Sequence, residues 1–202
     1  MMMDKDYKLT PLLYMALELA FRLHGRDARK ESPVPYMAHL LSVCAMVQLD
    51  GGCEEEAIAA LLHDALEDKP EEISREEIHK LFGKKVLDII EISSDTPHDY
   101  AGGEKPPWKV RKEAYIEHIK KTDPSLLRVT VADKVDNARA ILADHQRLGD
   151  DIWERFNAGK EDQLWYYENC LKAFKETGFK GPLLEEFRKL VNQLLNQAGN
   201  LS

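Results

Sequence analysis

The chain has 202 residues, of which 44% are hydrophobic and 32% are charged. This length suffices for one domain with a sizeable hydrophobic core. Lys and Arg number 28 against 36 Asp and Glu, so the formal net charge is −8. Such a balance argues against broad nucleic-acid binding, which needs a positive surface to neutralise phosphates. It leaves room for a small anionic substrate held by a local basic cluster.

The sequence favours neither a membrane protein nor a disulfide-rich one. Apolar runs fall short of the roughly 18 to 20 residues that a membrane span needs, and residues 1–6 lack the apolar core of a signal peptide. The three cysteines, at positions 44, 53 and 170, show no CxxC spacing, so a zinc ribbon is not expected. We therefore expect a cytoplasmic protein that binds no membrane. The pattern leaves the oligomeric state open.

The first half of the chain shows helical periodicity in three segments. The first helix is expected over about residues 11–25, and the cation-rich loop that follows suits either a solvated turn or an anion contact. A second helix begins near residue 36 and carries His39 on its first turn. Taken alone, a histidine there is more often a structural residue than a ligand. The third helix is expected over about residues 54–68.

This third, central helix carries more chemistry than any other segment. At 100° per residue its apolar positions fall on one arc, while the opposite arc holds His63, Asp64, Glu67 and Asp68. Glu67 follows His63 by one turn, and Asp68 follows Asp64 by one turn. This spacing places a carboxylate where it can orient or deprotonate a water. The simpler interpretation is a charged helix end. It is weakened because acids at a helix C-terminus oppose the macrodipole.

The remaining segments also indicate helices. A capping box of Ser74 and Glu77 opens one helix, which Gly83 ends, and helical periodicity returns over residues 86–92, 110–121, 125–142, 162–175 and 183–195. Residues 93–108 form a long irregular stretch, whose length is typical of a functional or mobile loop such as a lid over a site. We find neither strand alternation nor repeats. The prediction is an all-α, single-domain, multi-helix fold spanning residues 1–202, with its core at about 10–195.

The segment 125–142 is the second informative stretch. Its apolar residues at positions 127, 131, 135, 138 and 142 share one face, whereas Asp133 and Asn137, four residues apart, share another. An aspartate within Val-Thr-Val-Ala is costly to bury unless it is paired or binds a metal. A salt bridge is one explanation. The presence of His63 and Asp64 elsewhere favours a metal ligand.

Together these residues form a candidate metal-binding set of two histidines and two aspartates from three helices: His39, His63, Asp64 and Asp133. Imidazole and carboxylate ligands suit divalent transition metals such as manganese, iron or zinc, and helix bundles hold such ions between facing helices. Four protein ligands leave positions on a six-coordinate ion for a water or a phosphate oxygen. A metal in this setting lowers the pKa of water and polarises a phosphoryl group.

The order of this set, His39, then His63-Asp64, then Asp133, resembles the HD-domain phosphohydrolase superfamily. Residues 29–30, 35–39, 62–68 and 132–139 look like the hydrolase domain of the stringent-response enzymes, which remove the 3′-pyrophosphate from the alarmone (p)ppGpp. The match covers roughly residues 10–195. The chain is most similar to the stand-alone small alarmone hydrolases, which need manganese.

The resemblance implies a role for each matching residue. His39, His63, Asp64 and Asp133 would hold one Mn²⁺ per chain, with other divalent transition metals as possible substitutes, and Glu67 and Asp68 would activate water. Arg29 would contact the guanine and Asn137 the ribose of the nucleotide substrate. Lys30 and Arg139 are candidates for phosphate contacts.

The predicted activity is manganese-dependent hydrolysis of (p)ppGpp to GDP or GTP and pyrophosphate. One alternative is the same phosphohydrolase chemistry acting on another nucleotide phosphate. A second is a nucleotide sensor without turnover, against which the Glu67-Asp68 pair speaks, because a sensor needs no proton acceptor. A third treats the histidines and aspartates as satisfied core groups.

Overall fold

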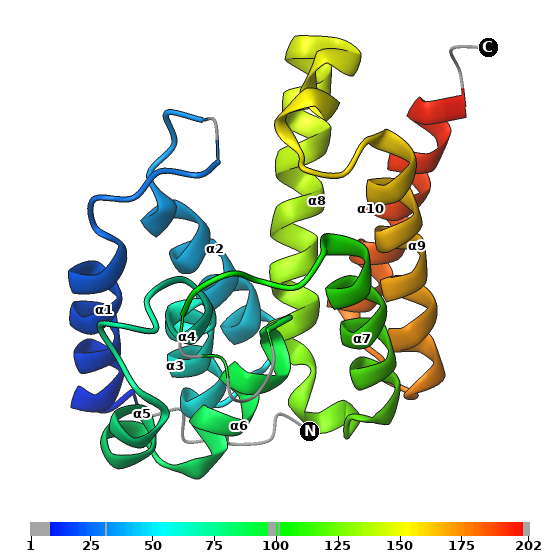
Figure 1. The fold of residues 1–202 in the computed structure, drawn as a ribbon. Coiled ribbons are helices and arrows are strands. Elements are labelled where there is room, and N and C mark those ends of the chain that lie inside the picture. The colour runs from blue at the N-terminus through cyan, green and yellow to red at the C-terminus, as the bar shows by residue number, and fades with distance from the viewer. Residues whose placement is uncertain (1–8, 31, 97–99, 101, 200–202) are drawn as a thin grey trace.

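The computed structural model describes residues 9–30, 32–96, 100 and 102–199, which fold into a bundle of α-helices with two short 3-10 helices (Figure 1). In chain order the elements are α1 (Pro11–His24), α2 (Tyr36–Leu49), α3 (Glu54–Leu62), α4 (Ala65–Asp68), α5 (Arg75–Phe82), α6 (Lys84–Ser93), α7 (Trp108–Lys121), η1 (Pro124–Leu126), α8 (Arg128–Leu148), η2 (Gly149–Arg155), α9 (Lys160–Glu176) and α10 (Pro182–Gly199). Within the described residues no strand forms, and the β-structure is one isolated bridge between Ala28 and Pro35. The predicted all-α class is confirmed.

Local sequence signals account for several helix ends. The Thr10 side chain accepts a hydrogen bond from the Leu12 amide at 3.1 Å and so caps α1. At the start of α5 the Ser74 hydroxyl accepts from the Glu77 amide while the Glu77 carboxylate accepts from the Ser74 amide, which is the capping box expected from the sequence. Gly83 has φ of +89° and separates α5 from α6.

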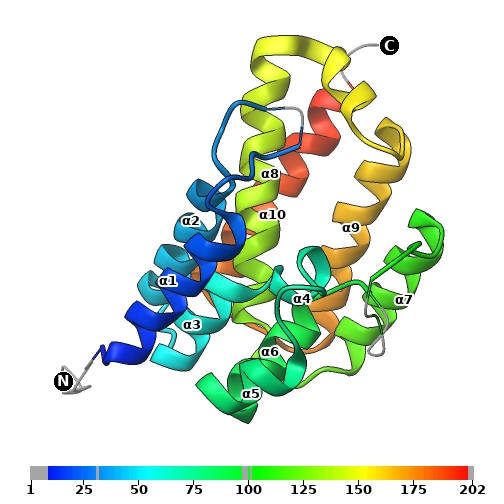
Figure 2. The same cartoon turned by 60° about the vertical axis from the view of Figure 1, so that its left-hand side comes forward.

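Helix α8 lies along the middle of the molecule in both ribbon views (Figure 1, Figure 2). It contacts α2, α3 and α6 on one side and α10 on the other. Residues 129–135 are all buried, so two consecutive turns are enclosed on every side. An enclosed helix is normally apolar all round, yet these turns carry Asp133 and Lys134. Two buried charges in one helix require partners, and α8 is therefore where the site must be sought.

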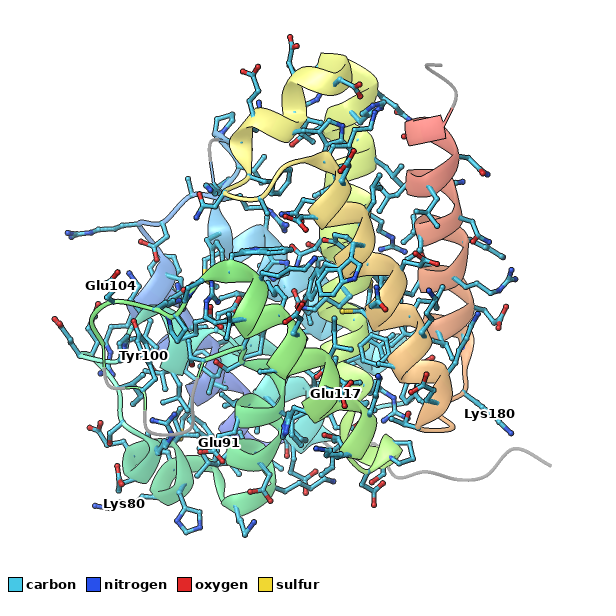
Figure 3. All side chains as sticks on the ribbon, turned by 45° about the vertical axis from the view of Figure 1, so that its right-hand side comes forward. Lys80, Glu91, Tyr100, Glu104, Glu117 and Lys180 are labelled. Carbon is cyan, nitrogen blue, oxygen red and sulfur yellow. The ribbon has the colours of Figure 1, made fainter. Side chains whose placement is uncertain are left out.

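The other helices pack around α8 and place the charged surface outside. Helices α1, α2 and α3 contact one another, as do α7 with α9 and α9 with α10. One hydrophobic cluster connects them, and charged side chains such as Lys80, Glu104 and Lys180 project outward (Figure 3). Among the described helices, none is long and apolar enough to cross a membrane.

The prediction of one continuous central helix over 54–68 is wrong. Helix α3 ends at Leu62, a turn follows at His63 and Asp64, and α4 then runs for four residues. The His63 ring binds the Ala60 carbonyl at 2.9 Å, and the Asp64 carbonyl accepts the amides of Glu67 and Asp68. In a regular helix adjacent side chains diverge by 100°. The turn instead brings His63 Nε2 within 3.0 Å of Asp64 Oδ2.

The irregular stretch expected at 93–108 corresponds to the connection between α6 and α7. Residues 97–99 and 101 lie outside the described residues, and the suggestion of a lid stays a prediction. The described part includes Asp95, whose carboxylate binds Arg111 and Lys112 at the start of α7. Further along the chain, the apolar face predicted for the helix around Asp133 is confirmed, since all five of its residues are buried.

Helix α10 adds an aromatic side chain to the core, and this contact can be tested by truncation. Phe187 is fully buried and its ring lies 5.8 Å from that of Phe174. Phe187→Ala should lower the free energy of unfolding by about 3–5 kcal/mol, because transfer and cavity costs add. Phe21, which is 65% exposed on α1, supplies the control, and Phe21→Ala should change it by less than about 0.5 kcal/mol. Urea denaturation measures both, and equal losses would contradict the packing described.

Candidate active site

Two histidines from different helices meet at the centre of the site. His39 on the first turn of α2 is 3% exposed, and His63 in the turn after α3 is 1% exposed. Their Nε2 atoms lie 3.3 Å apart. His39 Nδ1 lies 2.7 Å from Asp136 Oδ2, and His63 Nδ1 lies 2.9 Å from the Ala60 carbonyl oxygen. Because both acceptors need a hydrogen from Nδ1, each neutral ring presents a lone pair at Nε2.

Two carboxylates approach the same pair of nitrogens. Asp64 Oδ2 lies 3.0 Å from His63 Nε2 and 3.9 Å from His39 Nε2. Asp133 Oδ1 on α8 lies 3.3 Å from His39 Nε2 and 3.7 Å from His63 Nε2. The structure thus brings together all four residues of the candidate metal set, from α2, the turn after α3, and α8.

This arrangement has the donor chemistry of a divalent cation site. One ligand atom each from His39, His63 and Asp64 can be chosen so that all lie within 4.8 Å of one another. Two lone pairs facing each other at 3.3 Å repel unless a proton or a cation lies between them. Burial lowers the pKa of His63, but the carboxylates of Asp64 and Asp133 outweigh burial and hold that pKa well above its ordinary value. The pocket therefore favours positive charge at its centre.

The two proposed catalytic acids lie in α4, where Glu67 lines the small cavity that also contains Asp64 and Asp133, and Asp68 is exposed. Glu67 Oε1 lies 3.0 Å from Lys105 Nζ, and Glu67 Oε2 accepts a hydrogen bond from the Ser94 hydroxyl at 3.2 Å. The loop between α6 and α7 thus fixes the Glu67 carboxylate. Partial desolvation and the nearby carboxylates of Asp64 and Glu67 raise the pKa of Asp68 to about 7.

Asp136 is a functional candidate that the sequence interpretation did not assign. Its carboxylate accepts hydrogen bonds from His39 Nδ1 at 2.7 Å, from the Ser42 hydroxyl at 2.5 Å and from Arg29 Nη1 at 2.7 Å. It therefore sets the orientation of His39. Its place three residues after Asp133 on the same helix was a signal for it, since residues three apart lie on one face.

Tyr36 and Lys134 were also missed. The Tyr36 hydroxyl donates a hydrogen bond to Asp64 Oδ2, and Lys134 Nζ lies 2.6 Å from Asp133 Oδ2. Burial and the negative charge of Asp64 raise the pKa of Tyr36 above its ordinary value, so it stays a donor. Each carboxylate of the set thus has an oxygen held by a neighbouring donor, which fixes its orientation.

The predicted substrate contacts divide into two groups. Arg29 Nη2 donates to Asn137 Oδ1 at 2.5 Å, and Asn137 Nδ2 donates to Asp133 Oδ1 at 2.5 Å. Arg29 and Asn137 are therefore joined to the centre. Lys30 instead binds Asn157 Oδ1 at 2.9 Å, and Arg139 pairs with Glu186 of α10. The structure does not bring these last two to the metal set.

Two adjoining cavities serve this site. A small cavity of about 170 Å³ lies at the metal set, and a larger one of about 710 Å³ continues along α8. Arg29, Tyr36, His39 and Asn137 line both. Of the described residues, two acids, Asp136 and Asp144, line the larger cavity together with seven cations: Arg29, Lys30, Lys112, Lys134, Arg139, Arg147 and Arg155. In a chain with net charge −8, this cavity is suited to an anionic ligand.

A family model described as "HD domain" matches residues 16–164. The chain belongs to the HD domain family. This assignment confirms the resemblance drawn from the ordered histidines and aspartates. The matched segment contains His39, His63, Asp64 and Asp133.

Individual relatives carry more specific names than the family model does. A Drosophila melanogaster protein named guanosine-3′,5′-bis(diphosphate) 3′-pyrophosphohydrolase MESH1 is 30% identical over 127 residues, covering 61% of this chain and 65% of that protein. The Xenopus tropicalis protein of the same name is 31% identical over 131 residues, covering 63% and 68%. The chain thus spans about two thirds of these relatives.

A solved structure shares the fold. It is described as a metazoan ortholog of SpoT that hydrolyzes ppGpp, and it superposes with a TM-score of 0.71 at 22% identity, covering 96% of this chain and 99% of that one. At this identity the likeness concerns the fold alone.

The candidate metal set predicts stabilisation by a divalent ion. We expect Mn²⁺ at 100 times its Kd to raise the free energy of unfolding by about 2.7 kcal/mol, because it binds the folded state alone. His63→Ala and Asp64→Asn should remove this increment, and chelator should remove it from the wild type. Denaturation with and without Mn²⁺ measures it. If His63→Ala costs the same stability under both conditions and Mn²⁺ adds nothing, the residues are satisfied core groups.

The hydrogen bond from His39 to Asp136 predicts that a substitution of Asp136 changes metal affinity, although Asp136 is not a proposed ligand. Asp136→Asn should weaken Mn²⁺ binding about 10- to 100-fold, because the His39 ring loses the acceptor that orients it. Asp88→Asn, at a surface ion pair with Lys84, is the matched control and should leave affinity unchanged. Calorimetric titration compares the two, and equal affinities would remove Asp136 from the site.

Proposed function

We propose that this chain is a manganese-dependent phosphohydrolase that removes the 3′-pyrophosphate of (p)ppGpp, giving GDP or GTP and pyrophosphate. The observation that carries the proposal is the convergence of His39, His63, Asp64 and Asp133 at a small cavity that adjoins the larger, cation-lined one. The names of the relatives support the choice of substrate. Cytoplasmic location, expected from the sequence, fits a nucleotide substrate.

The metal set would hold one divalent ion. His39 and His63 offer imidazole nitrogens with fixed Nδ1 hydrogens, while Asp64 and Asp133 offer carboxylate oxygens. Such a mixed set suits manganese among the divalent transition metals. A divalent ion bound here supplies a Lewis acid and lowers the pKa of water.

The acid pair of α4 would manage the proton of the attacking water. Lys105 and Ser94 hold the Glu67 carboxylate, so it can orient a water by accepting its hydrogen. The pKa of about 7 at Asp68 matches that of a group that takes up a proton near neutral pH. We assign orientation of the water to Glu67 and proton acceptance to Asp68.

Side chains around the two cavities would position the nucleotide. The planar guanidinium of Arg29 can stack on a guanine while its Nη atoms stay on Asp136 and Asn137. The Asn137 amide offers a hydrogen bond to the ribose. Lys30 and Arg139, which line the larger cavity, are further proposed phosphate contacts. Both cavities together leave space for a nucleotide that extends from the metal set along α8.

Turnover of the nucleotide tests the proposal. Chelator-treated protein with Mn²⁺ restored should release pyrophosphate from ppGpp, and Glu67→Gln or Asp68→Asn should lower kcat about 10²- to 10⁴-fold, because general acid–base catalysis contributes that much. Pyrophosphate release with GTP, NADPH and deoxynucleotide monophosphates as parallel substrates provides the measurement.

The controls separate the alternatives. The Glu67 and Asp68 variants should still bind Mn²⁺ with wild-type affinity, since neither is in the ligand set. Turnover of another nucleotide but not of ppGpp would keep the chemistry and discard the substrate. Tight ppGpp binding with no product from the wild type would replace the hydrolase by a nucleotide sensor.

A further inference from the structure

The larger cavity ends far from the metal set, at the junction of α8 and η2. This far end is lined by Asp144 and Arg147 of α8, by Ile152 and Arg155 of η2, and by Phe156. Asn137 and Arg147 are ten residues apart on one helix, which places Arg147 about 15 Å further along the axis. The cavity is therefore longer than the chemistry at the metal set requires.

The far end has a net positive charge because one carboxylate forms ion pairs with two guanidinium groups. Arg147 Nη2 binds Asp144 Oδ1, and Arg155 Nη1 lies 3.2 Å from Asp144 Oδ2. Asp144 is the one acid that lines this end among the described residues. Each guanidinium has five N–H donors, and these contacts use one nitrogen of each. The remaining N–H donors of both arginines can bind an anion. A guanidinium binds two oxygens of one anion better than the ammonium group of Lys does.

Lys30 adds a third cation to the lining of this cavity. Lys30, in the loop between α1 and α2, binds Asn157, directly after Phe156, and so connects that loop to the segment after η2. Figure 1 shows the loop and the η2 connection on the same side of the molecule, toward the C-terminal end of α8. Side chains of a helix lean toward its N-terminus, so Arg147 leans back toward Asn137 and the metal set.

We propose that Arg147 and Arg155, together with Lys30, form a second anion subsite that takes the 5′-phosphate chain of the nucleotide. This inference rests on the proposed function, in which the 3′-pyrophosphate occupies the metal set. Arg29 and Asn137 line both cavities beside the metal set, so a base and ribose held by them would lie between the metal set and the far end. A substrate with phosphate chains at both ends matches a cavity with one cationic region at each end. The enzyme therefore discriminates nucleotides by the length of the 5′-phosphate chain.

The test varies the 5′ end of the substrate and keeps the 3′-pyrophosphate constant. Guanosine 3′-diphosphates with a 5′-monophosphate, 5′-diphosphate or 5′-triphosphate are hydrolysed by wild type, Arg147→Ala, Arg155→Ala and the double variant. KM for the 5′-diphosphate and 5′-triphosphate should rise about tenfold or more in the double variant, as expected for lost charged hydrogen bonds. KM for the 5′-monophosphate should change less than twofold, and kcat should stay constant throughout. Arg155→Lys should restore part of the loss.

Arg188 is the matched control. It pairs with Glu185 three residues earlier on α10, as Arg147 pairs with Asp144 on α8, but it does not line the cavity. Arg188→Ala should leave every KM unchanged. Equal KM increases for all three substrates, or the same increase in Arg188→Ala, would overturn the subsite, because the effect would then be general electrostatics. Unchanged KM in the double variant would overturn it as well.

A binding measurement separates this inference from the proposed function. Calorimetric titration of GMP, GDP and GTP, without any 3′-phosphate, should give affinity that rises with chain length in the wild type and not in the double variant. If ppGpp were never hydrolysed but this binding pattern held, the proposed function would fail and the anion subsite would stand. If ppGpp were hydrolysed and the binding pattern were absent, the subsite alone would fail.

Discussion

The structure depends on charged groups that are buried where helices meet. His39, His63 and Asp133 are almost fully enclosed, and Lys134 is enclosed beside them. Isolated charges in such a place would oppose folding, so each must find its partner within the protein or in a bound cation. Three separate segments supply the partners. The site is therefore also the point at which α2, the turn after α3, and α8 are fixed relative to one another.

Under the proposed function, the fold around this point would keep nucleotide recognition separate from hydrolysis. The metal set lies at the enclosed, N-terminal half of α8, where the helix is buried on all sides. The cation-lined cavity follows the C-terminal half, where the helix is partly open to solvent. A single straight helix thus carries an enclosed region with low hydration and a wetter region that admits a polar ligand. Low hydration strengthens electrostatic interactions at the reacting end.

The sequence predicted most elements well because they depend on local patterns. Through the order of four residues it also predicted that His39, His63, Asp64 and Asp133 lie together. The sequence-based prediction failed where contacts between distant segments determine the structure. Apolar periodicity continues through His63, so the break there is invisible without the Ala60 carbonyl that the ring binds. The local signal for Asp136 is limited to its spacing from Asp133, because its hydrogen-bond partners lie 94 to 107 residues away. Arg139 pairs with Glu186 because α10 packs on α8, a neighbour that no spacing within the chain reveals.

The Asp136 carboxylate has a consequence for how ligands communicate. One of its oxygens accepts hydrogen bonds from His39, in the metal set, and from Arg29, which is proposed to contact the nucleotide. A nucleotide bound against Arg29 would share the positive charge of that guanidinium and so leave more of the negative charge of Asp136 to His39, which makes that imidazole a stronger donor to a cation. Thermodynamic linkage requires the converse, that a bound cation alters nucleotide affinity by the same factor. Cation and nucleotide are thus expected to bind cooperatively through one shared oxygen atom.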